Sequence, residues 1–479
     1  MEVSKHVDVL IVGAGISGIG AAYRLQERCA GKSWLTLEAR DRVGGTWDLF
    51  RYPGVRSDSD MFTLGFPFRP WRSDLAIVGG EAIRDYIEQT AREFGIFDRI
   101  RFGEHVMRAN WSSADARWAV ETNHGLYSCR FLYLASGYYD YAQGYRPDWP
   151  GEDEFTGRIV HPQAWPEDLD FSGRRVAVIG SGATAVTLVP ALAEKAAHVT
   201  MIQRTPSYIV ARPSRDRTAA WLQRRLPGRV ADPLIRWKNL LLGIYFYGRA
   251  RRKPEHVGRR IREEIGKALP AGYPVARDFT PPYNPWDQRL CLIPDGDLFA
   301  AIRTGKVSIA TGTVDRFTPA GIQLATGENV DAEIVVTATG LNMRLLGGIA
   351  LAIDGKAVDP SHLFVWKGMM LSGVPNLFIA FGYANASWTL RSDLTARSAC
   401  RLIRRMDRQG ANCASPRAPQ GIGRKPVIAL SSGYVSRSTG LQPSQGDRDP
   451  WQVPQNYVRD LAAMTFGGIE DELEFGSRD

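Results

Sequence analysis

The fold is decided by Val7-Asp-Val-Leu-Ile-Val12 and the residues that follow it, Gly13-Ala-Gly15-Ile-Ser17-Gly18. The first six residues are rich in β-branched side chains and predict a parallel strand, and the apolar periodicity after Gly18 predicts a helix. The glycines allow a tight turn, close approach of a pyrophosphate and close helix–strand packing. Residues 33–37 predict the next strand, ending in Glu38, an acid that would bind a bare ribose diol and repel a 2′-phosphate. This site therefore suits FAD.

A second unit of the same kind begins at Arg175. Residues 175–179 and 198–202 predict strands, and residues 180–186 between them read GxGxxA at the start of a helix. When the units are aligned at their first glycine, Arg204 takes the place of Glu38. A guanidinium can bind a 2′-phosphate bidentately, so this site predicts NADPH, with a surface ion pair of Arg204 as the alternative. The expected NADP contacts here are Gly180, Ser181, Gly182, Ala183, Thr184, Ala185, Val186, Arg204 and Thr205.

Length and composition limit the classes of protein. The 479 residues are enough for two or three domains, and no apolar stretch reaches the length of a membrane span. The first apolar run leads into a glycine pattern instead of a signal-peptide cleavage site. Five scattered cysteines without CxxC spacing argue against a disulfide reductase and for a reducing, cytoplasmic location. The net charge of +9 favours anionic ligands, but no nucleic-acid-binding motif accompanies it, and we expect neither a nucleic-acid partner nor a metal.

A twelve-residue stretch precedes the second unit: Phe155-Thr-Gly157-Arg-Ile-Val-His161-Pro-Gln-Ala-Trp165-Pro166. Its pattern, FxGxxxHxxxWP, resembles the fingerprint of Baeyer–Villiger monooxygenases, flavoenzymes that use NADPH and O2 to insert oxygen beside a carbonyl. Related flavin N/S-monooxygenases usually have an aromatic residue other than Trp at the position of Trp165. The resemblance implies that Phe155, Gly157, His161 and Trp165 lie on an interdomain hinge and couple domain rotation to cofactor position. The alternative is a linker with a structural glycine and a buried histidine.

Two neighbouring segments carry the same resemblance, Gly44-Gly-Thr-Trp-Asp-Leu49 and Arg51-Tyr-Pro-Gly-Val-Arg-Ser-Asp58. The family pattern implies that the first lines the flavin and that Asp58 lies between flavin, nicotinamide and a catalytic arginine, whereas the alternative is a polar turn. Arg56 and Ser57 would also contact NADP, and Val106 would hold the adenine through its backbone. The expected FAD contacts are Gly13, Gly15, Ser17, Gly18, Glu38, Thr46, Trp47, Asp48, Leu49, Asp58 and Val106.

The catalytic arginine is expected in Asn284-Pro-Trp-Asp287-Gln-Arg289. In the resembling family an arginine near this point, supported by the aspartate of the first domain, stabilises the oxygenated flavin, and Arg289 matches it by position. A developing negative charge on oxygen needs a fixed positive charge in a dry site, and an arginine keeps its charge there. The alternative is a structural pair between Arg289 and Asp287.

Residues 213–285 interrupt the α/β pattern. Helices are expected over 218–226, 233–247 and 257–269, and the family carries a helical insert at this place. The insert is rich in arginine and contains an apolar run at residues 240–247. Either a helix buries this run and leaves a solvated basic rim, or residues 224–262 make peripheral contact with an anionic membrane, at its inner face.

The resemblance covers nearly the whole chain and is closest to the ethionamide-activating branch. It implies an α/β fold with two dinucleotide-binding (Rossmann-like) domains, the second inserted in the first and carrying the helical insert. The expected FAD domain comprises residues 1–145 and 342–479, the NADPH domain 146–212 and 286–341, and the insert 213–285. Residues 409–450 read as a long loop, a lid or a disordered segment, and Trp451 would either contact NADP or lie at the surface.

The function implied is oxidation of a small lipophilic ketone to an ester or lactone, with S-oxygenation of sulfides or thioamides as a second activity. One alternative is an N- or S-monooxygenase with little ketone activity, against which Trp165 argues. The other is an NADPH oxidase or a flavin redox sensor, which would leave Arg289 and the hinge without a purpose.

Overall fold

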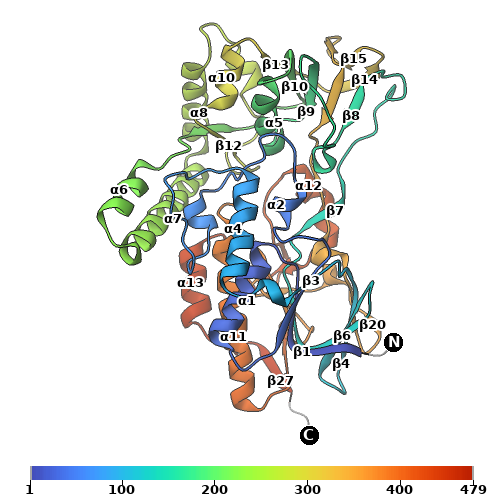
Figure 1. Ribbon diagram of the computed structural model, residues 1–479, viewed down its shortest axis with the longest axis vertical. Coiled ribbons are helices and arrows are strands. Elements are labelled where there is room, and N and C mark those ends of the chain that lie inside the picture. Colours follow the sequence, from blue (N-terminus) through green and yellow to red (C-terminus); the bar gives the residue numbers. More distant parts are fainter. Residues whose placement is uncertain (1–2, 477–479) are drawn as a thin grey trace.

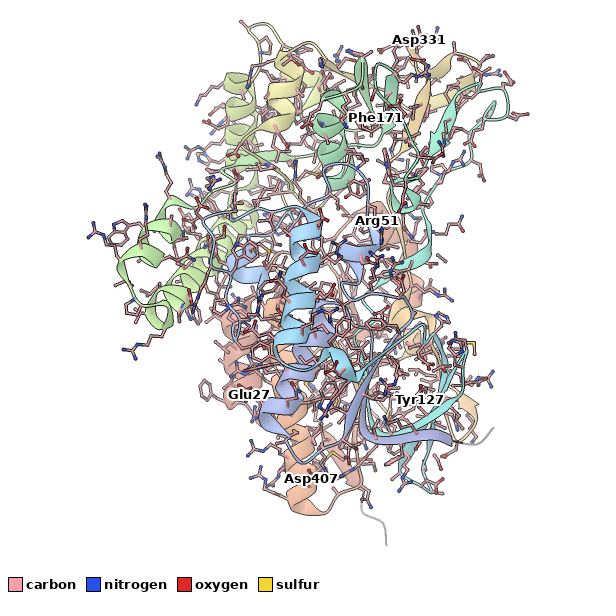
Figure 2. The ribbon with its side chains drawn as sticks, in the orientation of Figure 1. Glu27, Arg51, Tyr127, Phe171, Asp331 and Asp407 are labelled. Carbon is pink, nitrogen blue, oxygen red and sulfur yellow. The ribbon has the colours of Figure 1, made fainter. Side chains whose placement is uncertain are left out.

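The computed structural model describes residues 3–476, and the outermost residues of the predicted FAD domain, 1–2 and 477–479, lie outside that range. It contains two α/β units, one above the other in Figure 1. Figure 2 places Phe171 and Asp331 in the upper unit and Glu27, Tyr127 and Asp407 in the lower one, with Arg51 near the level where they meet. The units are connected by a two-stranded antiparallel ribbon, β7 (Tyr139–Gly144) with β18 (Leu341–Met343).

The lower unit is built on a nine-stranded sheet of order β20-β19-β4-β5-β6-β1-β2-β3, in which β23 also pairs with β6. β1 is parallel to β2 and β6, and Val9 to Val12 of β1 are buried on both faces of the sheet, as a covered parallel strand requires. Its strands are β1 (Val3–Val12), β2 (Trp34–Glu38), β3 (Ile100–Phe102), β4 (Val106–Ser112), β5 (Arg117–Thr122), β6 (Leu126–Leu134), β19 (Ala350–Ile353), β20 (Lys356–Ala357) and β23 (Leu377–Ile379). Its helices are α1 (Ile16–Arg28), α2 (Thr46–Leu49), α3 (Met61–Leu64), α4 (Gly80–Glu93), α11 (Trp388–Gln409) and α13 (Tyr457–Phe466).

The upper unit has a five-stranded parallel sheet of order β13-β10-β9-β17-β8. These strands are β8 (Arg158–Val160), β9 (Arg175–Ile179), β10 (His198–Gln203), β13 (Val307–Thr311) and β17 (Ile334–Thr337). Beside them lie α5 (Ala183–Ala193), α10 (Asp297–Arg303), the strand pair β11 (Ile209–Arg212) and β12 (Cys291–Pro294), and the meander β14 (Val314–Thr318), β15 (Gly321–Leu324) and β16 (Asn329–Asp331). The fingerprint stretch is therefore no free linker, because its residues 158–160 form the edge strand of this sheet.

The insert comprises α6 (Arg217–Arg225), α7 (Gly228–Arg252), α8 (Pro254–Ala268) and α9 (Val275–Asp278). It interrupts the upper unit in sequence, yet α7 packs on the lower one: Ile235 lies with Phe62 in one buried cluster, and Arg236 Nη1 donates to the carbonyl oxygens of Phe62 and Gly65 at 2.9 and 2.8 Å. The predicted start of this helix at Pro233 is wrong. The helix begins five residues earlier, and Pro233 is accommodated inside it.

The expectation of a featureless loop at 409–450 is wrong in part. This segment contains β24 (Cys413–Pro416), β25 (Lys425–Pro426), α12 (Gly433–Ser438) and β26 (Ser444–Gln445), and β24 pairs with β27 (Leu473–Gly476). A surface position for Trp451 is also wrong, because its side chain is fully buried in the lower core and hydrogen-bonds to Glu472. No helix within residues 3–476 combines the length and the apolar character that a membrane span requires.

Candidate active site

The first nucleotide loop joins β1 to α1 and has the geometry of a phosphate cradle. Gly13 has φ +104°, and a Cβ there would come within 2.6 Å of the Ala135 carbonyl oxygen, while a Cβ on Gly18 would overlap the Gly13 carbonyl oxygen. α1 begins after Gly15 without a side-chain cap and without an acidic residue in its first turn. Its first N–H groups are therefore suited to an anion, and the loop fits a pyrophosphate.

Glu38 closes this cradle at the end of β2. Its carboxylate accepts hydrogen bonds from the backbone N–H groups of Ala14 (2.6 Å) and Arg40 (3.0 Å). Burial raises the pKa of Glu38, and the two backbone donors oppose that shift. Val106 is buried at the start of β4, close to this point, since the backbone N–H of Glu104 donates to the Glu38 carbonyl. This placement is compatible with the predicted ribose and adenine contacts.

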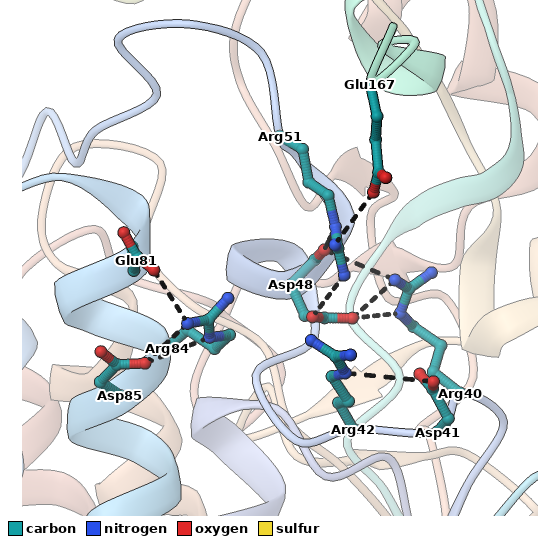
Figure 3. A network of polar contacts seen from close by, with 9 residues as sticks. All are labelled: Arg40, Asp41, Arg42, Asp48, Arg51, Glu81, Arg84, Asp85 and Glu167. Atoms are coloured by element: carbon teal, nitrogen blue, oxygen red, sulfur yellow. Dashed lines mark hydrogen bonds and ion pairs between the residues drawn. The ribbon is translucent and has the colours of Figure 1, made fainter.

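The glycine-rich segment after β2 folds against the first loop, since a Cβ on Gly15 would meet Gly45 Cα at 3.5 Å. Asp48 in α2 is fully buried, and its carboxylate pairs with Arg40 (2.6 Å) and Arg51 (3.2 Å), as Figure 3 shows. Arg51 also lies 3.7 Å from Glu167, just beyond the fingerprint stretch. The Asp48 carboxylate thus anchors this segment, and among the predicted flavin-lining residues the half-buried Thr46, Trp47 and Leu49 are the more accessible ones.

The second nucleotide loop has the same construction. Gly180 has φ +136°, and a Cβ there would come within 2.3 Å of the Ala338 carbonyl oxygen. α5 starts after Gly182 with no side-chain cap and no acidic residue in its first turn, and nothing lies within 4 Å of a Cβ on Gly182. The hydroxyl of Ser181 is hydrogen-bonded to Thr205 O at 3.0 Å, which ties the loop to the end of β10.

Arg204 is exposed at the end of β10 beside Thr205, and no described residue between 3 and 476 forms an ion pair with it. The alternative of a surface salt bridge is therefore not what the structure has. A free guanidinium next to an uncapped helix N-terminus is suited to a second phosphate group.

The loop at 51–58 brings the two units together. Tyr52 packs into the core of the upper unit and hydrogen-bonds to the Thr184 side chain, and a Cβ on Gly54 would meet Thr187 O at 2.8 Å. Arg56 pairs with Asp297 of α10 at 2.5 Å. Ser57 is buried, and its hydroxyl is hydrogen-bonded within the loop to Ser59 O at 2.9 Å. The predicted NADP contacts of this loop are Arg56, Ser57 and Asp58. Of these three, only Asp58 has its side chain next to a predicted catalytic candidate.

That candidate is Arg289. Its Nε lies 3.4 Å from Asp58 Oδ2, and the two side chains are 32% and 29% exposed. Asp58 lies just before α3, whereas Arg289 lies two residues before β12, so loops of the two units meet at this pair. Asp58 raises the pKa of Arg289 above its ordinary value. The alternative partner, Asp287, is instead paired with Arg251 at 2.7 Å.

Tyrosines that the sequence did not single out surround the arginine. Tyr138 and Tyr139 follow the strand–glycine turn at the end of β6 and join hydroxyl to hydroxyl at 2.9 Å, and Tyr434 comes from α12. Burial raises the pKa of Tyr139 to about 12, and the positive charge of Arg289 opposes that shift. Tyr138 also stacks on Trp388, whose Nε1 donates to Ser17 Oγ at 2.8 Å. The sequence signal that could have indicated Tyr138 and Tyr139 is that two tyrosines directly follow Ser136-Gly137 at the end of a predicted strand.

The fingerprint residues occupy structural positions. A Cβ on Gly157 would come within 2.2 Å of the Glu333 carbonyl oxygen, and Phe155 is buried against Phe317. His161 packs so closely on the ribbon that a Cβ on Gly144 would overlap its ring, and burial lowers its pKa. Trp165 packs on the core of the upper unit. The contacts at Gly157 and Gly144 are therefore so close that only glycine permits them.

Similarity to known proteins identifies the family. Residues 10–232 match the pyridine nucleotide-disulphide oxidoreductase family. The chain is 50% identical to FAD-containing monooxygenase EthA of Mycobacterium tuberculosis over 99% of both chains, and 43% identical to a probable FAD-binding monooxygenase, AlmA, of Acinetobacter baylyi over 98% of this chain and 95% of that one. The chain belongs to the FAD-containing monooxygenases. The predicted family is confirmed.

The fold of this monooxygenase is also that of a solved relative. Oxidized steroid monooxygenase bound to NADP superposes with a TM-score of 0.76 at 22% identity, covering 99% of this chain and 100% of that one. The predicted pair of dinucleotide-binding domains is confirmed. The first cradle, with its uncapped helix and its buried acid, is the part of the monooxygenase that fits FAD. All five cysteines are free, so the disulphide in the matching family's name has no counterpart here.

Proposed function

We propose that this monooxygenase uses NADPH and performs Baeyer–Villiger oxidation, inserting one oxygen of O2 beside the carbonyl of a small lipophilic ketone to give an ester or lactone. The observation that carries the proposal is the Arg289–Asp58 pair, which places a lasting positive charge where the loops of the two units meet. An arginine stays protonated throughout the physiological pH range, and Asp58 raises the pKa of Arg289 further above its ordinary value. Sulfides and thioamides are proposed as second substrates.

When bound, FAD reduced by NADPH supplies an activated oxygen derived from O2. Arg289 stabilises the negative charge that develops on oxygen during insertion, a contribution of about a hundredfold to a thousandfold in kcat for one well-placed donor. Asp58 orients the guanidinium through the ion pair. Gly180–Val186 would bind the pyrophosphate of NADPH, and Arg204 with Thr205 its 2′-phosphate. The aromatic wall of Tyr138 and Trp388 would exclude water from the reacting atoms.

The test is a product assay with the purified FAD-loaded enzyme, NADPH, isotope-labelled O2 and a long-chain methyl ketone. We expect an ester that carries one labelled oxygen. Arg289→Ala should still oxidise NADPH but should release H2O2 in place of ester, whereas Arg174→Ala, which removes an exposed arginine at the far end of β9, should behave like the unaltered enzyme. Sulfoxide without ester would favour the N/S-monooxygenase, and H2O2 alone would favour the oxidase or sensor.

We also propose that the insert makes peripheral contact with a membrane. Every exposed residue of α7 from Val230 to Phe246 is uncharged, over about 25 Å of helix, and the half-buried Lys238 in this stretch is paired with Asp216. Tyr245 is 58% and Leu241 53% exposed, so the alternative that the helix buries its apolar run is wrong for these residues. The exposed apolar residues of the face are Val230, Leu234, Trp237, Leu241, Leu242, Tyr245 and Phe246, with Trp221 on α6 nearby in the insert.

The charges around this face favour an anionic bilayer over a second copy of the chain. Exposed basic side chains flank it at both ends, namely Arg224, Arg225 and Arg229 at one end and Arg252 and Lys253 at the other. The nearby acids Asp216 and Asp232 are already paired, with Lys238 and Arg72. A symmetric dimer across this face would bring like charges together, whereas anionic lipid neutralises them and accepts the aromatic residues at its interface.

Flotation with vesicles tests this contact. We expect binding to vesicles containing phosphatidylglycerol at low salt, weaker binding at high salt, and little binding to phosphatidylcholine alone. The double variant Trp237→Ala, Leu241→Ser should lose binding, while Met107→Ser, which alters an exposed apolar residue on β4, should not. Absence of binding at both salt concentrations, or a concentration-dependent dimer that the double variant abolishes, would overturn the membrane proposal.

A further inference from the structure

The loop that carries Arg289 is held from three directions at one residue, Asp287. Asp287 Oδ1 accepts from Arg251 Nη1 at 2.7 Å, and Oδ2 accepts from the backbone N–H of Asn284 at 3.1 Å. Its carbonyl oxygen accepts from both the backbone N–H and the hydroxyl of Ser431, at 2.8 and 3.0 Å. Three segments remote in sequence, the end of α7, the arginine loop and the late segment before α12, therefore converge two residues before Arg289.

The conformation of the same loop depends on external support. Trp286 has φ +71°, a left-handed conformation that a bulky non-glycine residue rarely adopts and that persists only where neighbouring structure holds it. Its ring meets Tyr247 of α7 edge-on at 5.3 Å. Pro285 and Gln288 form an isolated bridge that closes the turn. Arg251 and Tyr247 lie one helical turn apart, so the end of α7 contacts both the carboxylate and the indole of this loop.

We propose that Asp287 is a positioning residue for oxygen insertion: by joining α7 and the late segment to the loop, it holds Arg289 against Asp58. The role rests on the proposed function of Arg289. Asp287 itself is kept from Arg289 by its pair with Arg251, so its negative charge does not neutralise the arginine. The contacts of Asp287 with Arg251, Asn284 and Ser431, called the clamp below, also fix the late segment. This segment brings Tyr434 to the site three residues after Ser431. It couples the insert to the chemistry without touching either cofactor loop.

The experiment compares Asp287→Asn, Arg251→Ala and the double variant as FAD-loaded enzymes. Both single variants should lower the fraction of oxidised NADPH recovered as ester by about two- to fivefold, the range expected for a half-exposed ion pair. The double variant should match the singles, because both remove the same ion pair. Anaerobic reduction of FAD by NADPH should keep its rate. Lys267→Ala, which breaks an exposed pair with Glu264 elsewhere in the insert, is the matched control and should change nothing.

Hydrogen exchange provides a readout independent of turnover. The amides of Asn284 and Ser431 should exchange faster in Asp287→Asn and Arg251→Ala than in Lys267→Ala. Faster exchange together with an unchanged fraction of oxidised NADPH recovered as ester would overturn the positioning role. Additive losses of ester in the double variant, or an equal loss in the Lys267→Ala control, would also overturn it. If Arg289→Ala leaves ester formation intact, the proposed function of Arg289 fails, while unchanged exchange at Asn284 and Ser431 would refute the clamp alone.

Discussion

Replacing Arg204 by alanine should separate the two nicotinamide cofactors. The guanidinium is exposed beside the uncapped start of α5, and no described residue among 3–476 pairs with it. Its removal should therefore leave the fold intact, with a change in unfolding free energy within about 0.5 kcal/mol. What is lost is its bond to the 2′-phosphate, which NADPH has and NADH lacks.

The size of the effect follows from the exposure of the site. Hydrogen bonds to charged groups contribute about 1.5–3 kcal/mol, and an exposed arginine belongs at the lower end of that range. Since about 1.4 kcal/mol corresponds to a factor of ten, the KM for NADPH should rise roughly tenfold and that for NADH should stay the same. Higher ionic strength should weaken the NADPH preference of the unaltered enzyme, because salt screens exposed charges.

The assay is steady-state oxidation of each cofactor with the FAD-loaded enzyme at two salt concentrations. Arg174→Ala is the matched control, because it removes the same charge from the same domain, next to the start of β9 and at the opposite end of the parallel sheet from Arg204. Equal changes in KM for NADPH and NADH would refute the assignment of Arg204, and so would a tenfold change in the control.

Other substitutions test the packing and charges around the site. Gly157→Ala should destabilise the protein by about 1–3 kcal/mol in thermal unfolding, because its Cβ would meet the Glu333 carbonyl at 2.2 Å, whereas Gly31→Ala, with open space around it, should not. Burial lowers the pKa of His161 below 6.5 in the folded protein. The neutral imidazole therefore contributes stability above pH 6.5, and this contribution is lost as the pH falls through the lowered pKa. His161→Gln should therefore flatten the decline of Tm from pH 7 to 5. Glu38→Gln should weaken FAD retention about tenfold by flavin fluorescence, and unchanged retention would remove it from the FAD site.

The two nucleotide loops could be predicted because their geometry is local. Gly13 and Gly180 adopt positive φ values, and a Cβ on either would come within 2.6 or 2.3 Å of the carbonyl oxygen of Ala135 or Ala338, so few other sequences could form these turns. The switch from Glu38 to Arg204 follows from the same alignment. The pairing of Arg289 with Asp58 was expected only from the family resemblance, since nothing in composition or periodicity relates two loops so distant in sequence.

Contacts between remote segments could not be predicted. α12 is six residues long and too short to show apolar periodicity, so the arrival of Tyr434 at the site had no sequence signal. The Arg251–Asp287 pair depends on where α7 ends, and the predicted end at residue 247 is wrong, because the helix continues to Arg252. Trp451 was expected either to contact NADP or to lie at the surface, yet tertiary packing encloses its side chain completely.

The packing of the insert affects how a single flavin can react first with NADPH and then with the substrate. α7 belongs to the NADPH domain in sequence, but Arg236 anchors it to the lower unit and Arg251 anchors the Arg289 loop to it. Asp58, which pairs with Arg289, is also part of the lower unit. Arg289, however, is also tied to the loop at 180–186, because Cys291 lies in the core of the upper unit and its Sγ lies 3.7 Å from the Ser181 carbonyl oxygen. A rotation at the predicted hinge that moves this loop relative to the flavin therefore acts on the contact between Arg289 and Asp58 as well. The positive charge needed for oxygen insertion and the site of the nicotinamide would then be repositioned together.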